Sequence, residues 1–295
     1  MTSSNRNLQL EQETFNFAHS CTASIGVLEN CSHLVLIPSY NSGAKLLETV
    51  RDARRYWAPV WVVIDGSTDE STAAVQQLSA NDSQIKIFVL PHNEGKGAAI
   101  LHGLRHAEAA GYTHALTMDG DGQHPAALIP WFISESIANP DALILGLPIF
   151  DRSAPRIRIF GRKLSNLWTG VETLWIANFD SLFGFRIYPI VELRKVLEDS
   201  RWMRRFDFDA EAVVRLRWRG FDLINLPAPV RYFAPHEGGV SHFRYVRDSI
   251  LLSWMHVRLI GYFIRHLPEI LAQRLKSFPH LSKLFDLKYK RPYRN

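Results

Sequence analysis

The sequence has few cysteines and lacks a long apolar run, and these two absences exclude several classes of protein. Only two cysteines, Cys21 and Cys31, occur in 295 residues. They are too few for a disulfide framework, so we expect a reducing compartment. The N-terminus does not combine a basic start with an apolar core, so we expect no secretory signal. The longest apolar stretch, Ile250–Ile264, is too short and too polar to cross a bilayer alone. We therefore expect a cytoplasmic protein.

Charge is distributed unevenly along the chain. Residues 1–230 contain 22 Lys and Arg against 25 Asp and Glu, whereas residues 231–295 contain 12 against 4. A mildly acidic body with a basic C-terminal segment predicts an anionic partner, either a membrane surface or a nucleic acid.

Short β-branched runs alternate with amphipathic windows between residues 33 and 145. This alternation predicts βαβ units and a mostly parallel sheet flanked by helices. The expected strands are His33–Ile37, Val60–Ile64, Ile85–Leu90, His114–Met118 and Ala142–Leu145. The expected helices between them are Gly43–Arg55, Asp69–Leu78, Lys96–Ala110 and Ala126–Ile137.

The regular alternation ends after Leu145. We expect a loop over Pro148–Pro155, helices near Arg158–Leu174 and Phe206–Trp218, and a strand pair near Leu223–Tyr232. The chain then divides into an irregular leader (1–30), an α/β domain (31–240) and a basic helical tail (241–295).

Four polar clusters follow expected strands: Pro38–Asn41, Asp65–Asp69, Asn93–Gly97 and Asp119–Gln123. In an open parallel sheet, ligands bind beyond the carboxyl ends of the strands, where the strand order reverses. The clusters therefore predict one shared binding site.

The acidic run carries the most specific chemistry of the four. Asp119, Asp121 and Gln123 alternate with glycines, and two carboxylates and an amide oxygen suit Mg²⁺ or Mn²⁺ completed by phosphate oxygens. An Asp-Gly turn that merely ends a strand is the alternative. Asp65 can accept a hydrogen bond from a base or a ribose hydroxyl, and Lys96 stands at a helix start that attracts phosphate.

Taken in order, these motifs resemble those of family 2 glycosyltransferases, and most closely the dolichyl- and polyprenyl-phosphate sugar synthases. The resemblance covers roughly residues 33–245 and implies the GT-A fold, a nucleotide-sugar donor, and inversion of the anomeric carbon. It implies Asp119, Asp121 and Gln123 as metal ligands. The implied donor-binding residues are Pro38, Tyr40, Asn41, Asp65 and Lys96.

Two later segments, Asp180–Arg186 and Phe206–Glu211, resemble the acceptor side of the family. We expect Asp121, Arg186, Asp209 and Glu211 to act in catalysis. Arg162 matches an arginine that the family places on the helix after the fifth strand.

The sequence departs from the family pattern at three places. Ile64 replaces the first of two adjacent acids, and Gly146-Leu147-Pro148 replaces the Gly-Ser-Arg of the lipid-phosphate synthases. His236 and His242 stand where that group carries cations. These departures leave the acceptor open between a lipid phosphate and a hydroxyl.

The chemistry of attack distinguishes the two acceptors. A phosphate is already anionic and needs cations, for which Arg162, Arg186, Arg244, His236 and His242 are candidates. A hydroxyl needs a base, for which Asp207, Asp209 and Glu211 are candidates. On a helix Asp207 and Glu211 share a face that Asp209 does not. The alternative is that these acids form an ordinary charged face, paired with the neighbouring arginines Arg204, Arg205, Arg215 and Arg217.

The tail over Tyr245–His266 predicts an amphipathic helix for a membrane interface. At about 100° per residue, Arg247, Arg258 and Arg265 fall within about 20° of one another, with apolar residues over most of the remainder. Such a helix can lie among anionic headgroups or pack as an ordinary helix. The pattern around Phe243-Arg244 also resembles glycosyltransferases of aryl-polyene lipid pathways.

The sequence thus favours a metal-dependent transferase that acts on a lipid-linked acceptor at the inner face of the plasma membrane. A sugar nucleotidyltransferase is less favoured, because Pro38–Gly43 is not a glycine-rich loop with an arginine. A non-catalytic nucleotide-sugar-binding module is the other alternative. No nucleic-acid-binding motif is present, so we expect no nucleic acid partner.

Overall fold

A seven-stranded sheet forms the centre of the protein, in strand order β3-β2-β1-β4-β6-β5-β7. The computed structural model describes residues 32–150, 156–174, 179–231, 233 and 245–276. The strands are β1 (His33–Ser39), β2 (Val60–Asp65), β3 (Ile85–Leu90), β4 (His114–Thr117), β5 (Ala142–Phe150), β6 (Arg186–Pro189) and β7 (Asp222–Val230). Every pairing is parallel except those of β6, which runs antiparallel to β4 and β5. The predicted mostly parallel α/β sheet is confirmed.

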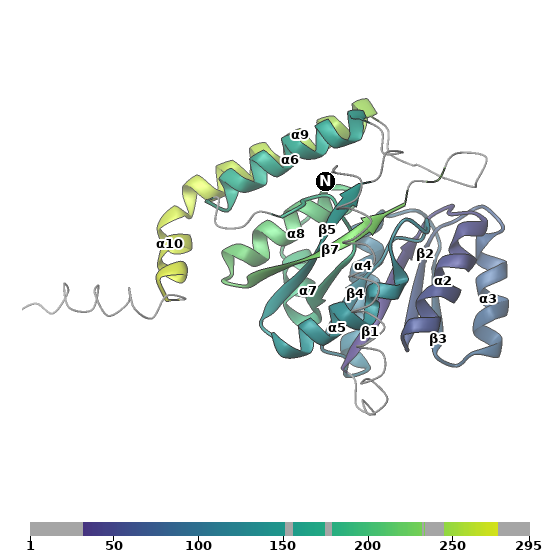
Figure 1. The fold of residues 1–295 in the computed structure, drawn as a ribbon. Helices are drawn as coiled ribbons and strands as arrows, with labels where there is room; N and C mark the ends of the chain where they lie inside the picture. The colour runs from purple at the N-terminus through teal and green to yellow at the C-terminus, as the bar shows by residue number, and fades with distance from the viewer. Residues whose placement is uncertain (1–31, 151–155, 175–178, 232, 234–244, 277–295) are drawn as a thin grey trace, which may run out of the picture.

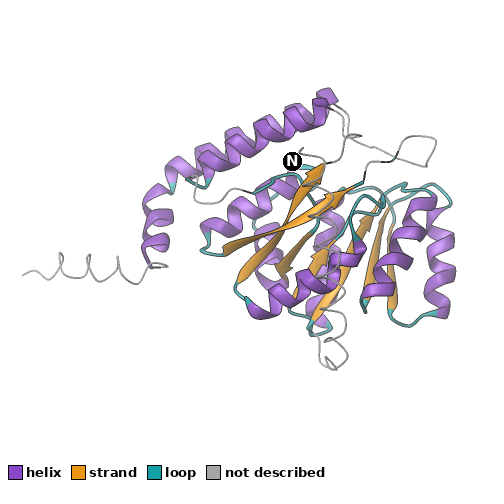
Figure 2. Ribbon diagram, in the orientation of Figure 1, coloured by secondary structure: helices purple, strands orange, loops and turns teal. Residues whose placement is uncertain are grey.

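Helices cover both faces of the sheet (Figure 2). One face carries α2 (Ala44–Tyr56), α3 (Ser71–Asn81), η1 (Ala126–Leu128) and α5 (Ile129–Ala138). The other face carries α4 (Lys96–Ala109), α7 (Ile190–Glu198) and α8 (Asp207–Trp218). Because side chains point to alternate faces of a strand, β1 supplies Leu34 and Leu36 to one core and Val35 and Ile37 to the other. Burial on both sides explains the unbroken apolar runs in the sequence.

The order of the strands reverses beside β1. The chain runs outward from β1 to β2 and β3, and then returns to place β4 on the other side of β1. The carboxyl ends of β1 and β4 therefore border the crevice where open α/β sheets bind ligands.

Helices α6 (Arg156–Glu172) and α9 (Tyr245–Arg265) lie side by side along the top of the molecule, and α10 (Leu267–Lys276) follows α9 (Figure 1). The inner side of α9 joins the core through Met255, Leu259 and Phe263. Among the described residues, no helix is long and apolar enough to cross a membrane. The proposed division of the chain at residue 240 stays a prediction.

Three expectations were wrong. The strand pair near Leu223–Tyr232 is a single strand, β7, which pairs in parallel with β5 along its full length. The loop expected from Pro148 begins later, because β5 continues to Phe150. Arg258 does not join a cationic stripe for headgroups: it lies 3.0 Å from Glu211 of α8 and stacks on Trp202.

The candidate donor and metal site

The loops after β1, β2 and β3 are tied together by their own polar side chains. Asn41 accepts a hydrogen bond from the backbone N–H of Thr68 at 2.7 Å. The carboxylate of Asp65 accepts one from Glu94 N–H and one from Gly95 N–H, each at 2.8 Å. Burial raises the pKa of Asp65, and it outweighs the two hydrogen bonds, which act to lower that pKa. The loops that carry these polar clusters, predicted to share one site, are therefore in direct contact with one another.

Of the predicted donor-binding residues, some line the site and others support it. Pro38 is buried within β1, whereas Tyr40 and Asn41 are partly exposed beyond its end. Asp65 is 2% exposed, and its contacts make it a support for the Asn93–Gly97 loop. Its contact with a nucleoside stays a prediction.

Lys96 joins two carboxylates from distant parts of the chain. Its Nζ lies 2.7 Å from Asp119 Oδ1 and 2.8 Å from Asp209 Oδ2. Burial works to lower the pKa of Lys96, but the two carboxylates outweigh it and raise the pKa, so the ammonium stays charged. The lysine that was predicted to meet phosphate thus also holds β4 and α8 together.

The acids of the run differ in their surroundings. Burial acts to raise the pKa of Asp119, yet Lys96 and His124 lower it overall. Burial and the charge of Asp119 raise the pKa of Asp121 to about 7, against a hydrogen bond from the Gln123 N–H and the charge of Lys96. The two carboxylates thus repel each other, and a divalent cation bound to both would offset that repulsion.

The residues fit a metal ion that also binds phosphate. Asp119, Asp121 and Gln123 offer the oxygen donors that Mg²⁺ and Mn²⁺ prefer. Within the described part of the chain, no group of three or more His, Cys, Asp or Glu could hold a metal by itself. A site of this kind would complete its ligand shell from the diphosphate of a donor.

His124 was not among the predicted site residues, although it directly follows Gln123. Its Nδ1 accepts a hydrogen bond from the Asp119 N–H at 3.0 Å, and its ring packs edge-on to Phe183. Burial lowers the pKa of His124 to about 4, so the ring is neutral at pH 7. His124 therefore fixes the backbone at the first aspartate.

The predicted acceptor-side residues do not all converge. Asp209 is in the site, 5% exposed, and burial raises its pKa against the opposing effect of Lys96. Glu211, expected as a second acid there, lies elsewhere. Its carboxylate is buried and bound by Arg215 at 2.7 Å and Arg258 at 3.0 Å. Glu211 is therefore paired with arginines, which was the alternative to a catalytic role for the acids Asp207, Asp209 and Glu211.

Arg186 and Arg162 are occupied by other protein groups. Arg186 is 0% exposed and donates to Tyr188 Oη at 3.0 Å, to the Asp180 carbonyl at 2.8 Å and to the Asp209 carbonyl. Arg162 forms an ion pair with Asp180. These contacts give both arginines a positioning role, and a catalytic role of Arg186 stays a prediction. His236, His242 and Arg244 lie outside the described residues.

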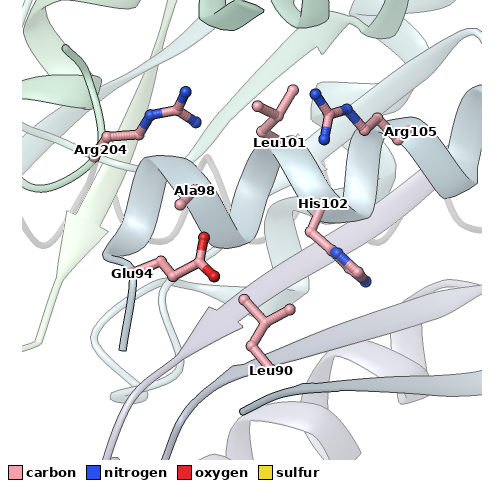
Figure 3. A pocket seen from close by; sticks show the side chains of 7 residues that line it. All are labelled: Leu90, Glu94, Ala98, Leu101, His102, Arg105 and Arg204. Atoms are coloured by element: carbon pink, nitrogen blue, oxygen red, sulfur yellow. The ribbon is translucent and has the colours of Figure 1, made fainter. Parts of the chain in front are cut away.

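A cavity of about 250 Å³ lies apart from this cluster, against α4 (Figure 3). Its lining mixes apolar and oppositely charged side chains: Leu90, Glu94, Ala98, Leu101, His102, Arg105 and Arg204. The guanidinium groups of Arg105 and Arg204 reach toward it from its two ends. The cavity shares no residue with the Lys96–Asp119–Asp209 cluster.

The sheet and the carboxylate–lysine cluster at its switch point define an α/β enzyme of the GT-A type. The sequence model for glycosyl transferase family 2 matches residues 34–179. The chain belongs to that family of glycosyltransferases.

Two relatives illustrate the likeness in sequence. The chain is 24% identical over 214 residues to the UDP-N-acetylglucosamine–dolichyl-phosphate N-acetylglucosaminyltransferase of Methanococcus voltae, an alignment that covers 67% of this chain and 85% of that protein. It is 34% identical over 105 residues to the putative glycosyltransferase CsbB of Bacillus subtilis, covering 34% of this chain but only 31% of that protein.

A solved structure shows the likeness in fold. Glucosyl-3-phosphoglycerate synthase of Mycobacterium tuberculosis, in complex with Mn²⁺, UDP-glucose and phosphoglyceric acid, matches with a TM-score of 0.56 and 14% identity. The match covers 86% of this chain and 82% of that one.

Proposed function

We propose that the protein is a metal-dependent, inverting glycosyltransferase that moves a sugar from a nucleotide-sugar to a lipid-linked acceptor at the cytoplasmic membrane face. The observation that carries the proposal is the pairing of Asp119 and Asp209 through Lys96, beside Asp121, whose pKa burial and Asp119 raise. The Mn²⁺ and UDP-glucose of the mycobacterial structure support the donor side. The dolichyl-phosphate transferase among the relatives supports a lipid acceptor.

The donor end requires charge neutralisation. Asp119, Asp121 and Gln123 would hold Mn²⁺ or Mg²⁺, which as a Lewis acid offsets the charge that builds on a departing nucleoside diphosphate. The Lys96 ammonium lies between the two carboxylates and adds a fixed positive charge close to the same place.

The acceptor end requires a proton acceptor only if the acceptor is a hydroxyl. Asp209 is then the candidate base, because Lys96 holds its carboxylate next to Asp119, and Glu211 is committed to arginines. A lipid phosphate would need cations instead. Arg162 already neutralises Asp180, so this chain has less free positive charge in its described acceptor region than the sequence suggested.

The surface of the α6–α9 pair supports the proposed contact with a membrane. Both helices expose large apolar side chains: Phe160, Leu164, Leu167 and Trp168 on α6, and Ile250, Trp254, Val257 and Ile264 on α9. Phe160 is 70% exposed and Ile264 67%. Lys163, Arg247 and Arg265 are exposed on the same two helices, as an interfacial surface facing anionic lipid requires.

A transfer assay tests the proposal directly. Radiolabelled UDP- and GDP-sugars would be offered with Mn²⁺ to polyprenyl phosphate and, separately, to diacylglycerol, which carries only a hydroxyl. We expect label in one lipid fraction, with loss of at least a hundredfold in Asp121→Asn, because that variant removes a metal ligand. Asp222→Asn, on an exposed carboxylate at the start of β7, is the matched control. Unchanged transfer in Asp121→Asn would overturn the metal assignment.

A further inference from the structure

The interface between α6 and α9 contains a buried polar array. His256 of α9 lies between two residues of α6: its Nδ1 is 2.8 Å from Glu172 Oε1, and its Nε2 is 3.1 Å from Ser165 Oγ. Glu172 is 0% exposed, Ser165 5% and His256 6%. Burying three polar groups between helices is costly unless each is hydrogen-bonded, so the array fixes how the two helices pack.

Ser165, His256 and Glu172 are the residue types of a hydrolytic triad, but no substrate can reach them. A nucleophile must reach a substrate, and all three side chains are enclosed between packed helices. The cavity in Figure 3 lies against α4 instead. The array must therefore act on its protein neighbours.

Those neighbours form a continuous path out of the helix pair. Ser181 Oγ lies 2.9 Å from Ser165 Oγ and 2.7 Å from Asn166 Oδ1. Asn166 Oδ1 also accepts from the Ser181 N–H at 2.8 Å. The path thus leads from α9, through the inner face of α6, to the turn that begins at Asp180.

That turn ends in the site. The carbonyl of Gly184 accepts a hydrogen bond from Thr117 Oγ1 at 2.8 Å. The backbone of Gly184 passes so close to the cluster that an added Cβ would lie 2.7 Å from Lys96 Nζ and 2.9 Å from Asp119 Oδ2. There is thus no room for a methyl group between Gly184 and the side chains of Lys96 and Asp119, so a displacement of the turn changes the space beside both groups.

We propose that His256 is a positioning residue: through Ser165 and Ser181 it couples the placement of α9 to the turn Asp180–Gly184 that borders the donor site. The inference rests on the proposed function, since it gives the turn a place beside the reacting groups. It also gives the α6–α9 pair a role beyond its apolar surface, because a displacement of α9 can reach the turn through this hydrogen-bonded route.

Hydrogen exchange tests the coupling without turnover. Ser165→Ala removes the hydroxyl that joins His256 to Ser181 and leaves no charge without a partner. We expect amides of residues 180–184 to exchange about threefold to tenfold faster in this variant, the effect of one lost hydrogen bond. Ser253→Ala, on the exposed face of α9, is the matched control and should not change the turn.

A pair of variants at His256 separates positioning from bulk stability. His256→Gln can still donate to Glu172 and accept from Ser165, whereas His256→Leu can do neither. We expect rapid exchange of the turn in His256→Leu and near-normal exchange in His256→Gln. If His256→Leu does not fold, Ser165→Ala decides the question alone. Unchanged exchange in folded Ser165→Ala would overturn the coupling.

Binding and transfer measured on the same variants keep the two proposals apart. We expect UDP with Mn²⁺ to bind Ser165→Ala more weakly than the parent protein and transfer to lipid to fall with it, because the turn lies beside Lys96 and Asp119. UDP binding and transfer that both stay unchanged in folded Ser165→Ala would contradict a coupling to the donor site. If the parent protein binds no nucleotide, the proposed function fails, and the exchange result still stands on its own.

Discussion

At the scale of single residues, the site is held by a few side chains that each serve two segments. Lys96 binds Asp119, which follows β4, and Asp209 of α8. Asp65 binds two backbone amides of the Asn93–Gly97 loop, and His124 accepts a hydrogen bond from the Asp119 N–H. Because these contacts replace solvent around buried charges, the site is preorganised by hydrogen bonds rather than by apolar packing.

Gly184 offers the sharpest test at this scale. Gly184→Ala would place a methyl group in contact with Lys96 and Asp119. We expect a loss of transfer of about a hundredfold, since displacements of this size misalign reacting groups. Initial rates under saturating donor measure the loss. Gly161→Ala, where an added Cβ meets nothing within 4 Å, is the matched control. Equal rates in both variants would show that the turn does not border the reaction.

At the scale of elements, the α6–α9 helix pair has two sides that differ in chemistry. Its inner side is occupied by the His256 array and by Met255 and Leu259, and its outer side is apolar and exposed. The sequence predicted an amphipathic α9, but it assigned Arg258 to the outer face. The spacing of residues along a helix shows which side chains share a face. It does not show which face packs against the protein, and here Arg258 faces α8 because it pairs with Glu211.

Vesicle binding tests the outer side of the pair. We expect the protein to cosediment with vesicles of phosphatidylglycerol and phosphatidylcholine, and Trp254→Ser with Phe160→Ser to weaken binding by about tenfold or more, because two large exposed apolar side chains are removed. Val89→Ser, exposed on the edge strand β3, is the control. Binding to DNA but not to vesicles would overturn the choice of partner.

At the scale of the whole molecule, the order of motifs predicted most of the fold. Five strands and the helices between them follow directly from runs such as Val60–Asp65, because buried parallel strands are continuously apolar. β6 and α7 were missed: β6 has four residues and its identity depends on pairing with β4 and β5. The acidic run Asp119–Gln123, the proposed metal site, was evident from local spacing. The pairing of Glu211 with Arg215 was among the alternatives, but Lys96 as the partner of Asp209 and Arg258 as a partner of Glu211 were not predicted, since they come from α4 and α9.

Buried histidines give the whole molecule an acid-sensitive stability. Burial and the nearby His114 lower the pKa of His33 to about 3, and burial also lowers that of His114. Unfolded histidine titrates near pH 6.5. Below that pH the unfolded state binds more protons than the native state, so stability falls as the pH falls from about 6.5 toward 3.

Urea unfolding measured between pH 7.5 and 5 tests this. Asp121, whose pKa burial and Asp119 raise to about 7, also titrates in this range and stabilises the native state as the pH falls, so the contribution of His33 is the difference between the parent protein and His33→Gln. We expect the free energy of unfolding to decrease by up to about 1.4 kcal/mol per pH unit for each neutral buried histidine, and the decrease to be smaller in His33→Gln. The same pH dependence in the parent protein and in His33→Gln would show that the His33 ring is protonated without cost.

The most direct test of the central claim is calorimetric titration of the protein with UDP and with GDP, each in Mn²⁺ and in EDTA. We expect one of the two nucleotides to bind in Mn²⁺, EDTA to abolish or greatly weaken this binding, and Asp121→Asn in Mn²⁺ to bind as weakly as the parent protein does in EDTA. Equal affinity in Mn²⁺, in EDTA and in Asp121→Asn would contradict a donor site built on Asp119 and Asp121.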